Sequence, residues 1–394
     1  MKNYCLDALA PLVFRGGKPF GAQSDTEDIL FPFPSSAAGL IRSQVMWQKQ
    51  WGFEQEHEGR GQLTHQQVQE LQQIATQGPF LVRYEANNQI TVLVPKPADA
   101  LYFKDPKHSE KIKLMRLAPQ DIANKEECGC DLPHDLLPVK MVTDVEGKPQ
   151  GGAAYWCLND SLRWQAGEEL SFDEVQQHGA QTLSIETRTH VALDDVSFAA
   201  SEGKLFQTAA YDLGHQAKAK HGGWQEQHYG FLIRTTQELP DSLVRFGGEG
   251  RLSRLTTAQL QGDEFKVSSQ LVEDIKQQGG LRLTLLTPAI FANGWLPSWL
   301  DQNTLEGVLP HTNIKVKLRA VAADRWLPVS GWDLNQHKPK AMRKAVAAGA
   351  VYWFECCSDD LDNIHQIAFQ SISDQEQDKL DGFGIVSVAA WQKK

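Results

Sequence analysis

Short apolar segments, each bounded by glycine, proline or polar turn residues, recur along the 394-residue chain. Such segments are typical of strands when they carry β-branched and aromatic residues, whereas apolar residues at helical spacing predict helices. The chain supplies both kinds in two successive sets, the second beginning between Asp241 and Gln278. We therefore predict an α+β fold with two domains, residues 1–255 and 256–394, and no short-period repeat.

The local patterns predict a strand over 3–14, a helix capped by Ser35-Ser36, and one amphipathic helix within 48–77. A hairpin over 80–94 would turn at Asn87-Asn88. The proline-containing stretch 95–152 predicts loops and short helices, and 258–278 a helical stretch. Residues 188–194 and 204–211 predict a hairpin with Gly203 near its turn, and Gly247 to Arg251 a glycine loop. Further strands are expected at 230–234, 281–286, 314–321, 350–354 and 385–390.

The net charge of −10, from 39 basic and 49 acidic residues, excludes a uniformly basic nucleic-acid binder. Residues Glu355 to Asp381 hold eight of these acids against one lysine, so the rest of the chain is nearly neutral. A nucleic-acid site must therefore be a local patch. We expect the acidic segment to lie away from that patch, facing a partner subunit.

No apolar stretch approaches the 18 residues of a membrane span, and Asp7 and Pro11 are poor signal-peptide chemistry, so we expect a cytoplasmic protein. The cysteines are typical of free thiols. Cys128, Cys130 and His134, with Cys157 as a distant fourth ligand, have an atypical spacing for zinc, and a polar loop is the favoured interpretation. The P-loop, G-x-S-x-G and H-E-x-x-H motifs are absent, and we predict neither a metal nor a cofactor.

Basic residues flank two glycines at the predicted N-terminal turn. Arg15, Lys18 and Phe20 flank Gly16-Gly17 ahead of the helix that begins near Ser36, and Arg42 lies about two turns into it. Free N–H groups and the helix dipole suit phosphate oxygens there. The alternative is that the basic residues solvate a turn and Arg42 pairs with a carboxylate.

A second basic cluster runs from Trp332 to Lys344 and has four basic residues against one acid. It includes Lys338, Lys340 and Arg343, and with Trp332 as a stacking surface it suits a single-stranded nucleic acid. A solvated loop is the alternative, and it is the favoured interpretation of the basic stretch 104–116.

Arg188 and His190 share one strand face because they are two residues apart. They could contact RNA, or His190 could act as the general base of a metal-independent ribonuclease. Gly247 and Gly248, followed by Arg251, allow close approach of a nucleic-acid backbone or simply form a turn.

The opening of the CRISPR RAMP proteins resembles two segments of this chain, Leu9–Phe20 (LAPLVFRGGKPF) and Phe31–Arg42 (FPFPSSAAGLIR). More narrowly, the chain resembles the third subunit of the type III-B (Cmr) effector, which sits at the crRNA 5′ end. Four further blocks are similar and follow in the family's order: Arg188–Asp194 with Gly203–Phe206, Arg245–Arg251, Gly331–Tyr352 and Gly382–Gly384.

The resemblance implies two ferredoxin-like (RRM-like) halves with hairpin and loop insertions, and a non-catalytic subunit that grips the crRNA 5′ handle. It further implies contacts with the large polymerase/cyclase-like subunit and the backbone RAMP subunits, and with target RNA indirectly. The predicted RNA-binding residues are Arg15, Lys18, Phe20, Ser36, Arg42, Arg188, His190, Gly247, Gly248, Arg251, Trp332, Lys338, Lys340 and Arg343. The alternatives are an endoribonuclease that processes crRNA precursors and a scaffold that contacts only protein.

Overall fold

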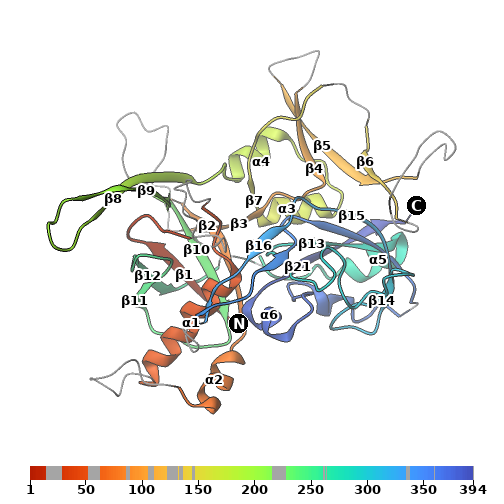
Figure 1. Cartoon of the computed structure of the whole chain (residues 1–394). Coiled ribbons are helices and arrows are strands. Elements are labelled where there is room, and N and C mark those ends of the chain that lie inside the picture. Colours follow the sequence, from red (N-terminus) through yellow and green to blue (C-terminus); the bar gives the residue numbers. More distant parts are fainter. Residues whose placement is uncertain are drawn as a thin grey trace. The chain divides into compact units, whose positions relative to one another are not determined.

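The structure is a computed structural model. It describes residues 1–14, 29–51, 63–85, 89–104, 111–121, 132, 136–143, 147–214, 228–260, 262, 264–333, 338–358 and 360–393, without the side chains of 332 and 333. The fold is α+β, as predicted, with mostly antiparallel strands and short helices (Figure 1). The chain divides into two compact units, each built from three separate segments.

Unit 1 comprises residues 1–90, 183–260 and 328–343. Its sheet has the strand order β11-β12-β1-β10-β2, and all four neighbouring pairs are antiparallel. The strands are β1 (Lys2–Ala8), β2 (Thr76–Tyr84), β10 (His228–Thr235), β11 (Ser242–Arg245) and β12 (Leu252–Thr257). Helix α1 (Pro34–Gln48) buries Ala37, Ala38, Leu40, Ile41 and Val45 in this unit, and α2 (His65–Gln72) follows it.

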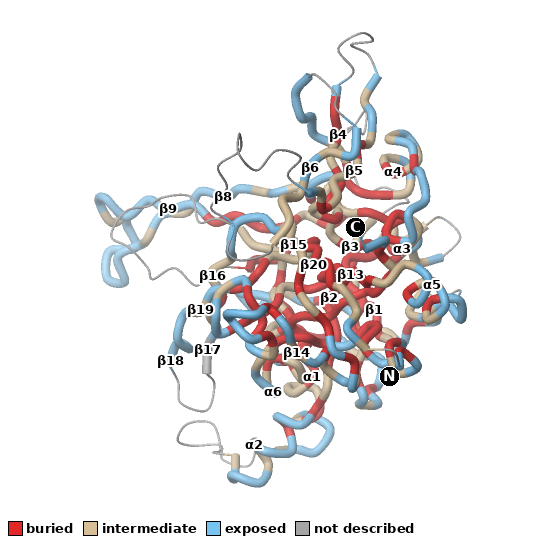
Figure 2. Tube along the Cα trace, turned by 90° about the vertical axis from the view of Figure 1, so that its right-hand side faces the viewer, coloured by how far each residue is buried: buried red, intermediate tan, exposed pale blue. Residues whose placement is uncertain are grey.

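A long hairpin of β8 (Ser184–Leu193) and β9 (Ala200–Asp212) also belongs to unit 1. Most of its residues are exposed, and the hairpin extends beyond the sheet of its unit (Figure 2). The short strands β17 (Trp332–Asp333) and β18 (Lys338–Pro339) pair in the third segment of the unit. Strands β16 (Leu327–Val329) and β19 (Arg343–Ala345) lie where the chain passes between the units.

Unit 2 comprises residues 91–182, 261–327 and 344–394. Its largest sheet has the order β14-β15-β20-β13-β21 and is antiparallel throughout. The strands are β13 (Gly279–Leu285), β14 (Glu306–Val308), β15 (Lys315–Ala322), β20 (Val351–Cys356) and β21 (Val386–Gln392). Helix α5 (Leu271–Gln278) ends at Gly279, whose left-handed φ of 71° lets its N–H bond to the Ile275 carbonyl.

The rest of unit 2 consists of short strands and helices. Strands β4, β5 and β6 form an antiparallel sheet, and β3 pairs with β7. Their bounds are β3 (Ile90–Pro95), β4 (Ala100–Lys104), β5 (Ile112–Pro119), β6 (Val139–Met141) and β7 (Tyr155–Cys157). The helices are α3 (Leu158–Gln165), α4 (Phe172–His178), α6 (Glu376–Asp381) and the 3₁₀ helix η1 (Ile364–Ile367).

Most predicted strands are present, including β8, β9, β10, β13, β15, β20 and β21, and the glycine loop joins β11 to β12. The hairpin turn is at Asp194, whose carboxylate accepts the N–H groups of Val196 and Ser197, and Gly203 lies inside β9. Strands β2 and β3 also match the prediction, but the turn at Asn87-Asn88 lies outside the described residues.

The prediction of loops and short helices for 95–152 is wrong in its described part, where β4, β5 and β6 form a sheet. Pro95 and Pro119 are the last residues of β3 and β5, positions where a missing N–H does not interrupt a strand. The Ser35-Ser36 N-cap is also wrong: Phe33 is the N-cap and Pro34 begins α1, as expected for a residue without an N–H. Within 48–77, α2 is much shorter than the predicted helix, and 258–278 is helical only in α5.

Two interleaved sets of segments make up the units, whereas the sequence predicts one division at residue 255. That division stays a prediction. The acidic segment uses several carboxylates internally: Asp378 and Asp381 are buried, and Asp374 accepts the N–H groups of Ala292 and Ser298.

Candidate nucleic-acid interface

Residues 12–14 of the N-terminal block hydrogen-bond to strand β9 of the hairpin and to the glycine loop. Leu12 and Tyr211 of β9 exchange two backbone hydrogen bonds, of 2.9 and 2.8 Å. One residue later, the Val13 carbonyl accepts the N–H of Gly248 at 2.8 Å. The Phe14 carbonyl then accepts the N–H of Leu30 at 3.4 Å. The N-terminal block therefore lies between the hairpin and the glycine loop.

The glycine loop between β11 and β12 depends on glycine at position 247. Gly247 has a φ of +82°, and a Cβ there would lie 2.8 Å from the Val13 carbonyl oxygen. Two later residues, Glu249 and Gly250, also have positive φ, of 58° and 66°. The rings of Phe14 and Phe246 pack edge to face with centroids 5.0 Å apart, which anchors both sides of the loop.

Arg251 is the basic residue of the loop. Its Nη2 donates to the Glu249 carboxylate at 3.0 Å, while its buried Nε has no hydrogen-bond partner in the part of the chain that the structure describes. A buried N–H without an acceptor is costly, so an acceptor brought by a ligand would be favourable here.

The hairpin presents Arg188 and His190 from neighbouring positions of β8. Arg188 is exposed and donates to Glu186 at 2.7 Å; this bond and the charge of Glu186 raise the pKa of its guanidinium. His190 bonds through Nε2 to the Thr208 hydroxyl at 2.8 Å.

Sequence reasoning missed Phe206 on that same face. It lies directly opposite His190 in the β8–β9 register, and the two rings stack with centroids 5.2 Å apart and planes within 16°. The predicted register of the hairpin contained the necessary signal, since residues opposite one another share a face.

The start of α1 carries Ser36 and Arg42. Ser36 is half-buried, and its N–H donates to the Phe33 carbonyl at 2.8 Å within the first turn. Arg42 is half-buried and donates from Nε to the Leu71 carbonyl of α2 at 3.0 Å. Part of its guanidinium therefore holds the two helices together.

The second basic cluster lies around β17 and β18. In their register, Trp332 is opposite Pro339 and Asp333 is opposite Lys338. Lys338 and Lys340 are exposed, and Arg343 is half-buried. All three belong to unit 1, as do Ser36, Arg42, Arg188, His190, Gly247, Gly248 and Arg251. Arg15, Lys18, Phe20 and the Trp332 side chain lie outside the described residues.

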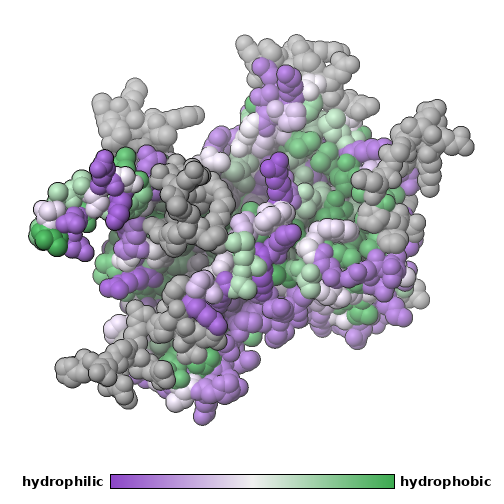
Figure 3. All heavy atoms as spheres, viewed as in Figure 1, coloured by the Kyte–Doolittle hydropathy of each residue, from purple (hydrophilic) through white to green (hydrophobic). Residues whose placement is uncertain are grey.

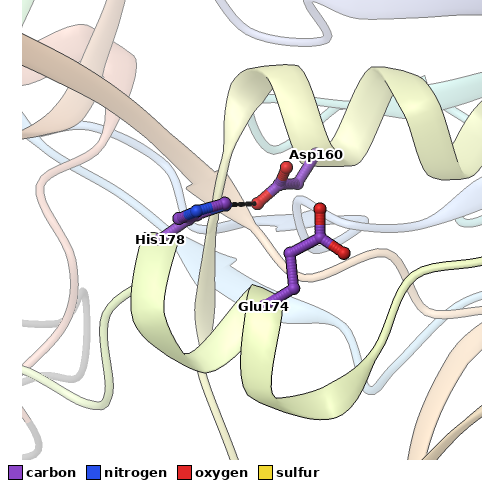
Figure 4. A group of neighbouring side chains, drawn as sticks. All are labelled: Asp160, Glu174 and His178. Carbon is purple, nitrogen blue, oxygen red and sulfur yellow. Dashed lines mark hydrogen bonds and ion pairs between the residues drawn. The ribbon is translucent and has the colours of Figure 1, made fainter.

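Asp160, Glu174 and His178 form a cluster of metal-ligating residue types between α3 and α4 (Figure 4). His178 Nδ1 lies 2.9 Å from Asp160, as the dashed line shows. Arg163 Nη1 lies 2.6 Å from Glu174 and 3.3 Å from Asp160, so a side-chain cation already neutralises the carboxylates. We interpret the cluster as an ion-pair network. The earlier zinc candidates Cys128, Cys130 and His134 lie outside the described residues, and Cys157 is the N-cap of α3.

The family model for "CRISPR-associated protein (Cas_Cmr3)" matches residues 4–391. The chain belongs to this family. The resemblance to the type III-B RAMP subunit is thereby confirmed over nearly the whole sequence.

Comparisons with other proteins give distant matches. A search of curated proteins finds none. A chain of the type III-B Cmr-beta complex bound to cognate target RNA has 16% identity and a TM-score of 0.46, over 89% of this chain and 86% of that one. The same complex with target RNA and AMPPnP gives 14% identity and 0.46 over the same shares. A chain of the type III-A Csm3-Csm4 subcomplex gives 12% and 0.32, over 93% and 96%. The family assignment rests on the sequence match.

Within the described residues, no helix has both the length and the apolar character needed to cross a membrane.

Proposed function

We propose that this chain is the non-catalytic crRNA-binding subunit of a type III-B (Cmr) RNA-targeting effector complex in the cytoplasm. It holds the crRNA 5′ handle and docks the large polymerase/cyclase-like subunit to the backbone RAMP subunits, and it meets target RNA indirectly, through the crRNA. Two ferredoxin-like halves are part of this proposal.

The observation that carries the proposal is that the N-terminal block, in a member of this family, hydrogen-bonds at Leu12 to strand β9 of the hairpin and at Val13 to the glycine loop. The Gly247–Arg251 loop lies at this point, and the exposed Arg188 lies on β8 three residues beyond Ile185, the register partner of Tyr211. Glycine removes the Cβ obstacle to a close backbone, and arginine can bind phosphate bidentately. A single-stranded handle suits such a surface, since RNA is read mostly where it is unpaired.

The surroundings of His190 favour a binding role over catalysis. Among the described residues its ring bonds only to the Thr208 hydroxyl and stacks on Phe206, and no carboxylate contacts it. A stacked imidazole beside an arginine suits contact with bases and phosphates.

Purification of the complex through a tag on this chain, followed by sequencing of the bound RNA, tests the proposal. We expect the bound RNA to be crRNA that begins with repeat-derived sequence. Wild type should carry it at full occupancy, and an Arg188→Ala/Arg251→Ala variant should carry it at reduced occupancy. Complexes without crRNA would contradict the proposal, and unchanged occupancy in the variant would favour a scaffold that contacts only protein.

Incubation of the purified chain with repeat RNA in EDTA tests the non-catalytic role. We expect no specific cleavage. Specific cleavage that is lost in His190→Ala would establish the endoribonuclease instead.

A further inference from the structure

The β11–β12 hairpin has one buried face and one exposed face. Val244, Ser253 and Leu255 point into unit 1 and are almost completely buried. The alternate positions, Leu243, Arg245, Leu252 and Arg254, are all exposed. Strand β11 is the first strand in the sheet order, so this face lies at an edge of the sheet.

Basic and apolar side chains form a checkerboard on the exposed face. The register sets Leu243 opposite Arg254 and Arg245 opposite Leu252, so the two arginines are diagonal neighbours. Diagonal Cβ atoms in an antiparallel pair are about 7–8 Å apart. The two leucines are 61% and 44% exposed, so the arginines stand beside apolar surface.

The guanidinium groups of Arg245 and Arg254 have no ion-pair or hydrogen-bond partner among the described residues. Asp7 is opposite Arg254 in the β1–β12 register, but its carboxylate lies 3.4 Å from His228 Nε2. By contrast, Arg188 and Arg251 are paired with Glu186 and Glu249. The unpaired arginines near the glycine loop are therefore two that the sequence prediction did not include.

We propose that the exposed face of β11–β12 is a second RNA-binding surface, on which Arg245 and Arg254 bind successive phosphates of the strand that the glycine loop holds. This inference rests on the proposed function. Continuity favours RNA over an acidic protein: Arg245 is two residues before Gly247, so a backbone held at the loop passes it. Leu243 and Leu252 then contact the apolar faces of ribose and base.

The test uses the full-length chain and a fluorescein-labelled synthetic copy of the crRNA recovered with the complex. Anisotropy titrations between about 50 and 200 mM salt compare wild type with Arg245→Ala/Arg254→Ala. The matched control is Lys148→Ala/Arg325→Ala, which removes the same charge from exposed positions of unit 2. A third variant, Arg245→Lys/Arg254→Lys, keeps the charge.

We expect the double alanine variant to lose about tenfold affinity per arginine. Its slope of log K against log salt should become shallower by about 1.4, at about 0.7 for each phosphate contact on a single strand. The lysine variant should keep the slope, and the control should match wild type.

Unchanged affinity and slope in the double alanine variant, with RNA bound by wild type, would overturn this inference and leave the proposed function intact. RNA affinity that is kept while the variant is lost from the complex would identify a protein interface instead. Failure of wild type to bind the RNA would overturn both.

Discussion

The backbone N–H of Gly248 donates a 2.8 Å hydrogen bond to the Val13 carbonyl oxygen. This bond ties the loop between β11 and β12 to the N-terminal block, two residues before Arg15 in the sequence. The geometry of the candidate interface therefore depends on a close approach of two backbones, which only residues without a large side chain permit.

Gly247→Ala tests that dependence. The new Cβ would lie 2.8 Å from the Val13 oxygen and would hold a left-handed φ, so we expect a loss of about 1–3 kcal/mol in unfolding free energy and weaker crRNA retention. Gly248→Ala is the matched control for stability, because a Cβ there meets Val13 at an ordinary 3.6 Å. Urea unfolding compares the two variants; equal losses of unfolding free energy would contradict the account.

Asp99→Ala tests the buried ion pair of unit 2. The Asp99 carboxylate accepts from Arg282 at 2.8 Å and from Trp164 Nε1 at 3.1 Å, and it is completely buried. Its removal leaves Arg282 buried without its counter-ion, so we expect a loss of about 3–5 kcal/mol. Asp362→Ala, which removes an exposed partner of Lys276, should cost about 1 kcal/mol or less. Urea midpoints that shift equally would disprove the buried pair's importance.

Cys5 should react more slowly than Cys357. Burial raises its pKa to about 11, whereas Cys357 is exposed. Since the thiolate is the reactive form, iodoacetamide at pH 8 should label Cys357 first and Cys5 only after unfolding. Peptide mass mapping follows both sites, with labelling in urea as the control; rapid native labelling of Cys5 would contradict its burial.

The same pKa predicts a loss of stability at high pH. The unfolded chain releases the Cys5 proton near pH 8.5, whereas the folded chain keeps it to about pH 11, so the free energy of unfolding falls as pH rises between these values. The urea midpoint should fall across this window in wild type and fall less in Cys5→Ala. Identical pH profiles would show that Cys5 does not contribute.

Arg163→Gln tests the α3–α4 cluster as an ion-pair network. Hydrogen bonding from Arg163 lowers the pKa of Glu174, so its stabilising effect is present above about pH 4.3 and is lost as the pH falls further. The variant should melt at a lower temperature at pH 7 and show a smaller decrease in acid. EDTA should change neither protein; a lower melting temperature of wild type in EDTA would identify a metal site instead.

The sequence predicted the elements whose signals are local. Alternation over 188–194, with 204–211 as its partner, predicted the β8–β9 hairpin, and the glycines at 247, 248 and 250 predicted the loop between β11 and β12. Proline was misleading in 95–152, because a proline that ends a strand looks the same in sequence as one that breaks it. The predicted start of α1 was too late for a related reason. Pro34 occupies the first helical position, where the sequence prediction placed the N-cap at the serines that follow it.

The arrangement of the candidate site depends on contacts that have no local signal. Nothing in the sequence joins Leu12 to Tyr211 or Val13 to Gly248, and these bonds connect the N-terminal block to the hairpin and to the glycine loop. The partners of charged residues were also unpredictable. Arg42 donates a hydrogen bond to Leu71 and Arg251 donates one to Glu249, whereas Arg245 and Arg254 are exposed.

The tip of the β8–β9 hairpin carries exposed Val196 and Phe198, a further apolar surface visible in Figure 3.

A crosslinking map of the crRNA in the assembled complex tests the central claim most directly. The account predicts that nucleotides of the 5′ handle crosslink to residues 188–190, 245–254 and 338–343, and not to the acidic segment from Glu355 to Asp381. Handle crosslinks confined to that acidic segment, or to subunits other than this chain, would contradict it.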